Sequence, residues 1–135
     1  MQQFIKWPYS VEMRKRAREF AKGYDRLRRE ADELIEQAPV MDGQPRGTMT
    51  GDPVAAAAIR RERITREIGI IEGALLDIEP EYRAGVLENV CRGVPMWKLD
   101  EASERTWSRK RGTFLKGIVE RACWIENDPH GWHQS

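Results

Sequence analysis

Apolar and small side chains recur at alternating intervals of four and three residues along the first part of the chain. They occupy Met13, Ala17, Phe20, Tyr24, Leu27, Ala31 and Leu34. Such intervals place one side of an α-helix against a partner, as in the heptad repeat of coiled coils. The pattern predicts a long amphipathic helix. Gly23 is its candidate point of bending, because glycine costs about 1 kcal/mol relative to alanine inside a helix.

A second set of positions with the same spacing follows a segment rich in glycine and proline. The set comprises Val54, Ala57, Arg61, Ile64, Ile68, Ile71, Leu75 and Ile78, with one polar member. Asp52 is a favourable N-cap and Pro53 a favourable first residue, so a second helix is expected to begin there. The preceding segment 39–51 is expected to be a mobile loop, and it lacks the Gly-Lys-Ser/Thr sequence of a phosphate-binding loop.

Two amphipathic helices joined by a short connector most simply pack antiparallel. Residues 1–79 are therefore expected to form a long, coiled-coil-like helical hairpin that supports the rest of the chain. The alternative is that one apolar face pairs with another copy of the chain and gives a homo-oligomer. A coiled coil usually needs at least about three to four heptads, so the spacing alone leaves both arrangements open.

In the C-terminal part, a shorter helix is predicted to precede a longer one. Pro80 suits the first turn of a helix, and Gly93 ends it. A short amphipathic turn over 96–102 then leads to Ser103, a favourable N-cap for a helix that reaches about as far as Cys123. No segment alternates in the manner of a β-strand, so the predicted fold class is all-α.

One side of this last helix is apolar and the opposite side is basic. At about 100° per residue, the side expected to face the core carries Trp107, Phe114, Leu115 and Ile118. The opposite side carries Arg105, Arg109, Gly112 and Lys116. Residues 103–123 hold six Lys or Arg against two Glu, whereas the whole chain has a formal net charge of only +1. Positive charge is thus concentrated on this helix.

A basic helix that follows a shorter helix and a glycine-containing break is typical of a helix-turn-helix, here residues 80–125. Cations opposite DNA phosphates release counterions, and arginine can bind guanine through two hydrogen bonds in the major groove. The pattern therefore indicates that the binding partner is double-stranded DNA. The alternative is a solvated charged face without a ligand.

The segments EYRAGVLENVCRGVP (81–95) and ASERTWSRKRGTFLKGIVERA (102–122) resemble the C-terminal module of phage-encoded regulators of the RinA/ArpU type. They are also similar to the promoter-binding C-terminal region of bacterial sigma factors. In these families the second helix is the recognition helix, and its Ser-x-x-Thr-hydrophobic opening is matched by Ser103, Thr106 and Trp107. The resemblance implies a regulator of phage late or packaging genes that acts near RNA polymerase in the bacterial cytoplasm.

The candidate DNA contacts divide into base-reading and phosphate-binding groups. The N-terminal part of a recognition helix usually approaches the base edges, which favours Arg105, Thr106 and Arg109. The cations expected to contact phosphates are Lys110, Lys116, Arg92 and Lys98, and the hydroxyls of Ser103 and Thr113 flank the basic face.

The first predicted helix is also basic. Residues 14–29 hold eight Lys or Arg and two acidic residues, whereas residues 30–38 hold four acidic residues and no base. One interpretation is an auxiliary surface for phosphates or for a protein partner. The other is a solvated face stabilised by ion pairs within the helix and between the two helices of the hairpin, such as Arg26–Glu30 and Arg29–Glu33.

Two other functions compete with that of a transcription regulator. A phage small terminase subunit also combines a helix-turn-helix with a helical hairpin and recognises packaging DNA as a ring. Its DNA-binding module usually precedes the oligomerising helices, whereas here the module follows them. A protein-interaction module would instead use Arg105, Arg109 and Lys116 to bind an acidic partner such as a polymerase subunit.

Enzymatic chemistry is not indicated, because the sequence lacks the nucleophile-elbow and His-Glu-x-x-His motifs. No cofactor is expected. Cys91 and Cys123 lack zinc-ligand spacing and are expected to be buried, reduced thiols. His130 and His133 lie in the segment 126–135, which is expected to be a flexible tail without a metal site. The chain shows no apolar run long enough for a membrane span and no signal peptide, so a cytoplasmic location is expected.

Overall fold

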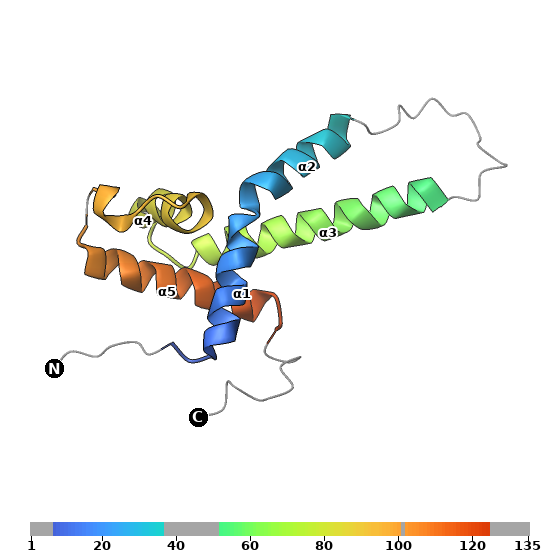
Figure 1. Cartoon of the computed structure of the whole chain (residues 1–135). Helices are drawn as coiled ribbons and strands as arrows, with labels where there is room; N and C mark the ends of the chain where they lie inside the picture. The colour runs from blue at the N-terminus through green and yellow to red at the C-terminus, as the bar shows by residue number, and fades with distance from the viewer. Residues whose placement is uncertain (1–6, 37–51, 101, 125–135) are drawn as a thin grey trace.

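The computed structural model describes residues 7–36, 52–100 and 102–124, and every regular element in these ranges is helical. The elements are α1 (Val11–Lys22), α2 (Tyr24–Glu36), α3 (Asp52–Leu75), α4 (Pro80–Val86), the π-helical turn η1 (Leu87–Cys91), the 3₁₀ turn η2 (Met96–Lys98) and α5 (Glu104–Arg121) (Figure 1). The predicted all-α class is confirmed. The expected loop 39–51 and tail 126–135 lie outside the described residues. Within those residues, no helix is both long and apolar enough to cross a bilayer.

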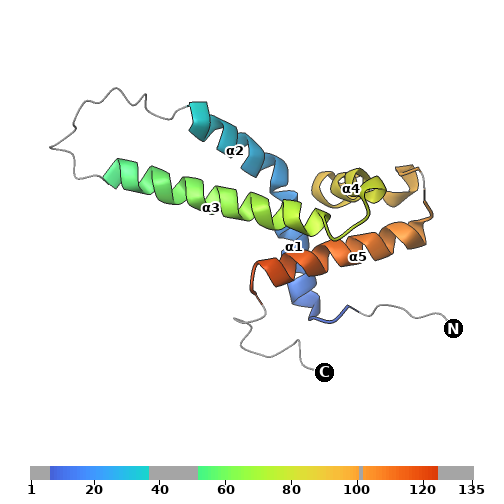
Figure 2. The same cartoon turned by 180° about the vertical axis from the view of Figure 1, so that it is seen from behind.

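The predicted first helix is divided at Gly23 into α1 and α2. The Gly23 N–H donates to the Phe20 carbonyl at 3.1 Å, and helical bonding resumes where the Leu27 N–H donates to the Gly23 carbonyl at 2.8 Å. Figures 1 and 2 show α2 beside α3 and running in the opposite direction, whereas α1 crosses α5 and also contacts η1. The regularly spaced apolar positions therefore pack against different elements: α1 packs against α5 and η1, whereas α2 packs against α3.

One hydrophobic cluster connects α1, α2, α3, α4, η1 and α5. Its most deeply buried large side chains are Phe114, Ile64, Ile71, Leu115, Ile118, Val86 and Val119. The α3–α5 contact within it is close because small residues face each other there. A Cβ on Gly117 would lie 3.1 Å from the Ala74 Cβ and 2.5 Å from Asp77 Oδ2. The guanidinium of Arg121 donates to both Asp77 oxygens, at 2.7 and 2.9 Å, and ties the end of α5 to the residues that follow α3.

The helix that begins at Pro80 ends as predicted at Gly93, which has a φ of 74°. Only glycine adopts this conformation readily. The Val94 N–H donates to the Glu88 carbonyl at 3.0 Å and closes the final turn. On the core side of α4, Gly85 lies directly against the ring of Trp107, so that α4 and α5 are in close contact.

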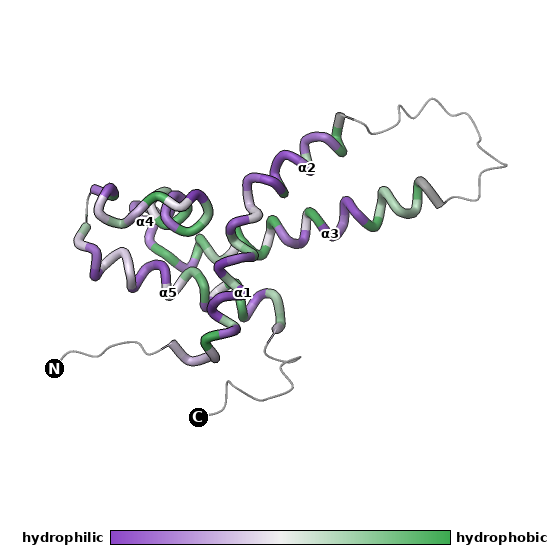
Figure 3. The backbone as a smooth tube through the Cα atoms, in the orientation of Figure 1, coloured by the Kyte–Doolittle hydropathy of each residue, from purple (hydrophilic) through white to green (hydrophobic). Residues whose placement is uncertain are grey.

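Hydrophobic residues continue toward the outer end of α3 (Figure 3). Ile64, Ile68 and Ile71 are buried as predicted, but Val54 is 62% exposed and Ile59 is 68% exposed. Among the described residues, the predicted apolar face of α3 is therefore buried at Ile64, Ile68 and Ile71 and exposed at Val54, and Ile59 is an exposed apolar side chain outside that face.

Candidate nucleic-acid interface

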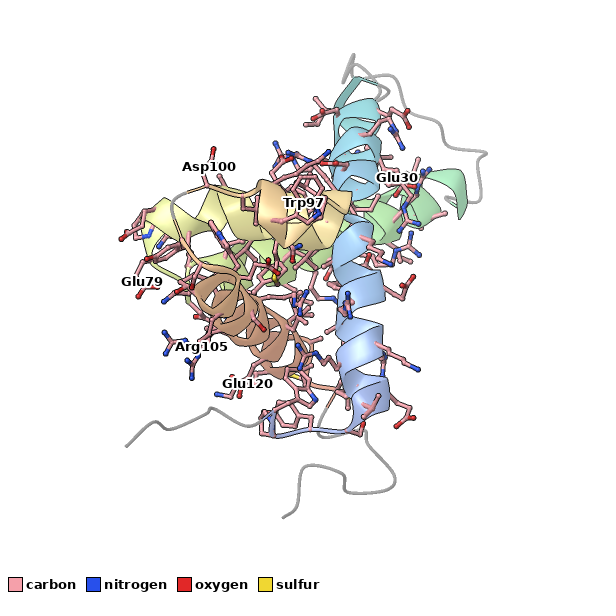
Figure 4. The ribbon with its side chains drawn as sticks, turned by 60° about the vertical axis from the view of Figure 1, so that its left-hand side comes forward. Glu30, Glu79, Trp97, Asp100, Arg105 and Glu120 are labelled. Carbon is pink, nitrogen blue, oxygen red and sulfur yellow. The ribbon has the colours of Figure 1, made fainter. Side chains whose placement is uncertain are left out.

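The candidate interface is the outward side of α5. Its opposite side is anchored in the core by Trp107, Phe114, Leu115 and Ile118, all buried as predicted. Arg105 and Arg109 are exposed and lie one turn apart near the start of the helix. Figure 4 shows Arg105 extending outward from α5. The structure thus presents these two guanidinium groups on a rigid helical support.

Three hydroxyl groups near this surface bond within α5 and its cap. The Ser103 hydroxyl accepts the Thr106 N–H at 3.2 Å, which makes Ser103 the N-cap, and it donates to Thr106 Oγ1 at 3.2 Å. The Thr113 hydroxyl donates to the Arg109 carbonyl at 3.2 Å. The predicted N-cap is confirmed. The DNA contacts suggested for Ser103, Thr106 and Thr113 stay predictions.

Lys110 is held on the α4 side of the helix. Its Nζ lies 2.7 Å from Glu79 Oε1 and 4.9 Å from the centre of the Tyr82 ring, and the side chain is only 22% exposed. The hydrogen bond from Lys110 is the main cause that lowers the pKa of the Glu79 carboxyl. A DNA phosphate would have to compete with Glu79 for Lys110, so Lys110 is not part of the proposed interface.

Lys116 remains on the outward side and is half-exposed. Its Nζ lies 3.3 Å from Glu120 Oε2 along the same helix. Glu120 also accepts a hydrogen bond of 2.9 Å from the Tyr9 hydroxyl, which connects α5 to the segment before α1. Burial and this hydrogen bond raise the pKa of Tyr9 to about 12. Exposed lysine–glutamate pairs contribute little, so Lys116 can exchange Glu120 for a phosphate at small cost.

The two candidate cations outside α5 differ in their surroundings. Arg92 donates to both carboxylate oxygens of Asp25, at 3.0 and 3.1 Å, and also binds Glu88, so it links the end of η1 to α2. These hydrogen bonds raise the pKa of Arg92, and the one to Asp25 lowers the pKa of that carboxyl. Lys98 is exposed and lies 5.3 Å from the centre of the Trp97 ring. Arg92 is thus engaged within the fold, whereas Lys98 faces outward.

Arg111 is a residue of interest that sequence reasoning missed. It is half-buried where α1 packs on α5, and its Nε is buried without a hydrogen-bond partner among the described residues. Burial, followed by the positive charges of Arg18 and Arg14, lowers its pKa. The helical wheel could have identified Arg111, because this charged residue lies only about 40° from Trp107, on the core-facing side of α5.

The ion pairs of α1 and α2 are partly those expected. Among the described residues, Arg26–Glu30 and Arg29–Glu33 are not among the ion pairs, but the intrahelical pair Lys22–Glu19 forms within α1. Arg28 instead reaches Glu72 of α3 at 3.3 Å, and the Tyr24 hydroxyl donates to the same carboxylate at 2.6 Å. Arg28–Glu72 is thus a pair between the two neighbouring helices, as the alternative of a solvated, ion-paired face expects.

The described residues contain no group of three or more His, Cys, Asp or Glu side chains placed to hold a metal ion. Cys91 is buried as expected, but Cys123 is exposed, so its expected burial is wrong; neither is in a disulfide. No protein family model, no curated protein and no solved structure matches this chain.

Proposed function

We propose that this protein is a sequence-specific double-stranded DNA-binding regulator of phage transcription, with α5 as its recognition helix. The observation that carries the proposal is the pair of exposed arginines, Arg105 and Arg109, on a helix whose other side is fixed in the core. In this proposal α4, η1 and α5 form the helix-turn-helix, and the antiparallel α2 and α3 are its supporting hairpin.

The dimensions of α5 suit the major groove of DNA. Its 18 residues span about 27 Å, and the groove, about 12 Å wide, admits one α-helix. Arg105, Thr106 and Arg109 lie in the first turns, the part of a recognition helix that usually approaches base edges. Lys116 lies two turns further along and reaches a backbone phosphate. Lys98, on the connection between the two helices, reaches another phosphate.

The test is a selection of preferred duplexes from a random pool, followed by fluorescence anisotropy against scrambled competitor DNA at several salt concentrations. Arg109→Ala should cost about 1–3 kcal/mol on the preferred sequence and relax the preference, because a base contact is lost. Lys116→Ala should weaken all duplexes alike and reduce the salt slope by about one. Arg60→Ala, at an exposed position of α3, is the matched control.

Equal losses on preferred and scrambled DNA for both substitutions would contradict this division of roles. No duplex binding even at low salt would contradict DNA recognition as a whole. The protein-interaction module would then be favoured, with the basic face of α5 and the 70% exposed Trp97 as its binding surface for an acidic partner, such as a subunit of RNA polymerase.

One observation favours the small terminase subunit as a second candidate. The exposed Val54 and Ile59 of α3 are apolar side chains that assembly into a ring would cover. Sedimentation velocity separates the two candidates together with the DNA selection. A closed ring that prefers packaging-site DNA would support the terminase, whereas a smaller species that prefers promoter DNA would support the regulator.

A further inference from the structure

Arg14 and Arg18 belong to α1 and Arg111 to α5, two helices that cross, and we propose that these three arginines together bind a phosphate group. Arg14 and Arg18 lie one turn apart on α1, and Arg111 comes from α5, which α1 crosses. The site is distinct from the outward face that carries Arg105 and Arg109, because Arg111 points to the side of α5 that α1 covers.

The first argument is the surroundings of Arg111. Its side chain is half-buried, and its Nε is closed off from solvent with no hydrogen-bond acceptor among the described residues. A buried donor without a partner costs free energy that a folded protein normally avoids. A bound anion would supply the missing acceptor.

The second argument is the balance of charge. None of the ion pairs among the described residues includes Arg14, Arg18 or Arg111. Some other basic side chains of the same helices do have acidic partners, as Lys22 has Glu19 and Lys110 has Glu79. Three like charges close enough to influence one another repel, and burial strengthens that repulsion. Arg111 bears most of the cost, because Arg14 is only partly buried and Arg18 is exposed, and a bound negative group would relieve it.

The third argument is the geometry of the side chains. The Arg14 guanidinium lies 5.4 Å from the centre of the Trp7 ring, and Trp7 Nε1 donates to the Ser10 carbonyl at 2.9 Å. Trp7 is thus held at the N-cap of α1 and orients Arg14. Guanidinium groups match the oxygens of a phosphate through paired hydrogen bonds, and three of them can surround its several oxygens.

The phosphate group has two possible sources with the same chemistry. One is the backbone of the duplex bound on α5, in which case the inference rests on the proposed function and α1 contributes a contact beside the recognition helix. The other is a small phosphorylated compound bound independently of DNA. The experiment therefore has one arm for each source.

The first arm measures thermal unfolding of the full chain with inorganic pyrophosphate against sodium chloride of equal ionic strength. Pyrophosphate should raise the melting temperature of the wild type and of the control Arg60→Gln, and the rise should be lost in Arg111→Gln and in Arg18→Gln. Without pyrophosphate, Arg111→Gln should melt no lower than the wild type, because the substitution removes a buried positive charge from between two others. This second readout separates loss of a phosphate site from damage to the fold.

The second arm measures duplex binding by the same variants. If the phosphate belongs to DNA, Arg18→Gln should weaken binding about tenfold and lower the salt slope by about one, with sequence preference unchanged. Unchanged duplex binding together with a lost pyrophosphate response would identify a small phosphorylated ligand. A wild type that binds pyrophosphate but no DNA would contradict the proposed function and leave the site established.

Two results together overturn the inference. Pyrophosphate raises the melting temperatures of wild type, Arg111→Gln and Arg18→Gln equally or raises none of them, and all three proteins bind duplex DNA equally well. An equal rise would be the general effect of an excluded salt.

Discussion

Among the described glycines, Gly85 leaves the least room for an added side chain. A Cβ added at Gly85 would lie 2.2 and 2.5 Å from two atoms of the Trp107 ring. Carbon atoms in contact are normally about 3.5–4.0 Å apart, so the ring or the helix would have to move by roughly 1 Å or more. The Trp107 ring has little freedom to move, because it is 2% exposed and packs edge-on against Tyr82 with ring centres 5.5 Å apart.

Two opposing terms set the magnitude for Gly85→Ala. Overpacking a core costs about 1–3 kcal/mol, whereas replacing glycine by alanine inside a helix gains about 1 kcal/mol. The clash is severe, so we expect the upper part of the first range and a net loss of about 1–2 kcal/mol. For a chain of this size, that loss lowers the melting temperature by about 3–8 °C.

Gly69→Ala is the matched control, because a Cβ at Gly69 of α3 would meet nothing within 4 Å. It should raise stability by about 0.5–1 kcal/mol, since only the helix-propensity term acts. Circular dichroism during thermal and urea unfolding measures both variants. A Gly85→Ala protein as stable as Gly69→Ala would refute the packing argument. In a Trp107→Leu background the cost of Gly85→Ala should shrink, because the two positions interact directly.

Three further predictions concern titratable groups. The hydrogen bond from Arg92 lowers the pKa of Asp25 below its ordinary 3.8. Any loss in the free energy of unfolding that Asp25→Asn causes at neutral pH should therefore disappear at pH values increasingly below 3.8, where the folded carboxyl becomes protonated. Urea unfolding at a series of pH values measures this difference. Burial raises the pKa of Cys91 to about 12. A thiol reagent should therefore label the exposed Cys123 in the native protein and Cys91 only after unfolding. Equal labelling rates of the two cysteines in the native protein would contradict the structure. Burial raises the pKa of Tyr9 from its ordinary 10.0 to about 12. The difference in the free energy of unfolding between wild type and Tyr9→Phe should therefore persist up to pH 10.0 and disappear toward pH 12. A difference that is already lost below pH 10.0 would contradict this.

The sequence by itself determined the local features of this protein. Ser103 caps α5, Pro80 starts α4 and Gly93 ends the helical segment, because caps and breakers act through the backbone of a few neighbouring residues. The core-facing side of α5, centred on Trp107 and Phe114, followed from helical period alone. The exposure of Arg105 and Arg109, on which the proposed function rests, was predictable for the same reason.

Only the tertiary structure decided which helix each face meets and which charges have partners. The heptad spacing is the same on both sides of Gly23, yet α1 packs on α5 while α2 packs on α3. Lys110 and Arg92 are predicted DNA contacts whose partners within the fold, Glu79 and Asp25, lie far away in the sequence. Arg111 became a candidate phosphate ligand only because α1 brings two more arginines beside it. Helical period specifies the direction of a side chain, whereas the partner in that direction depends on long-range packing.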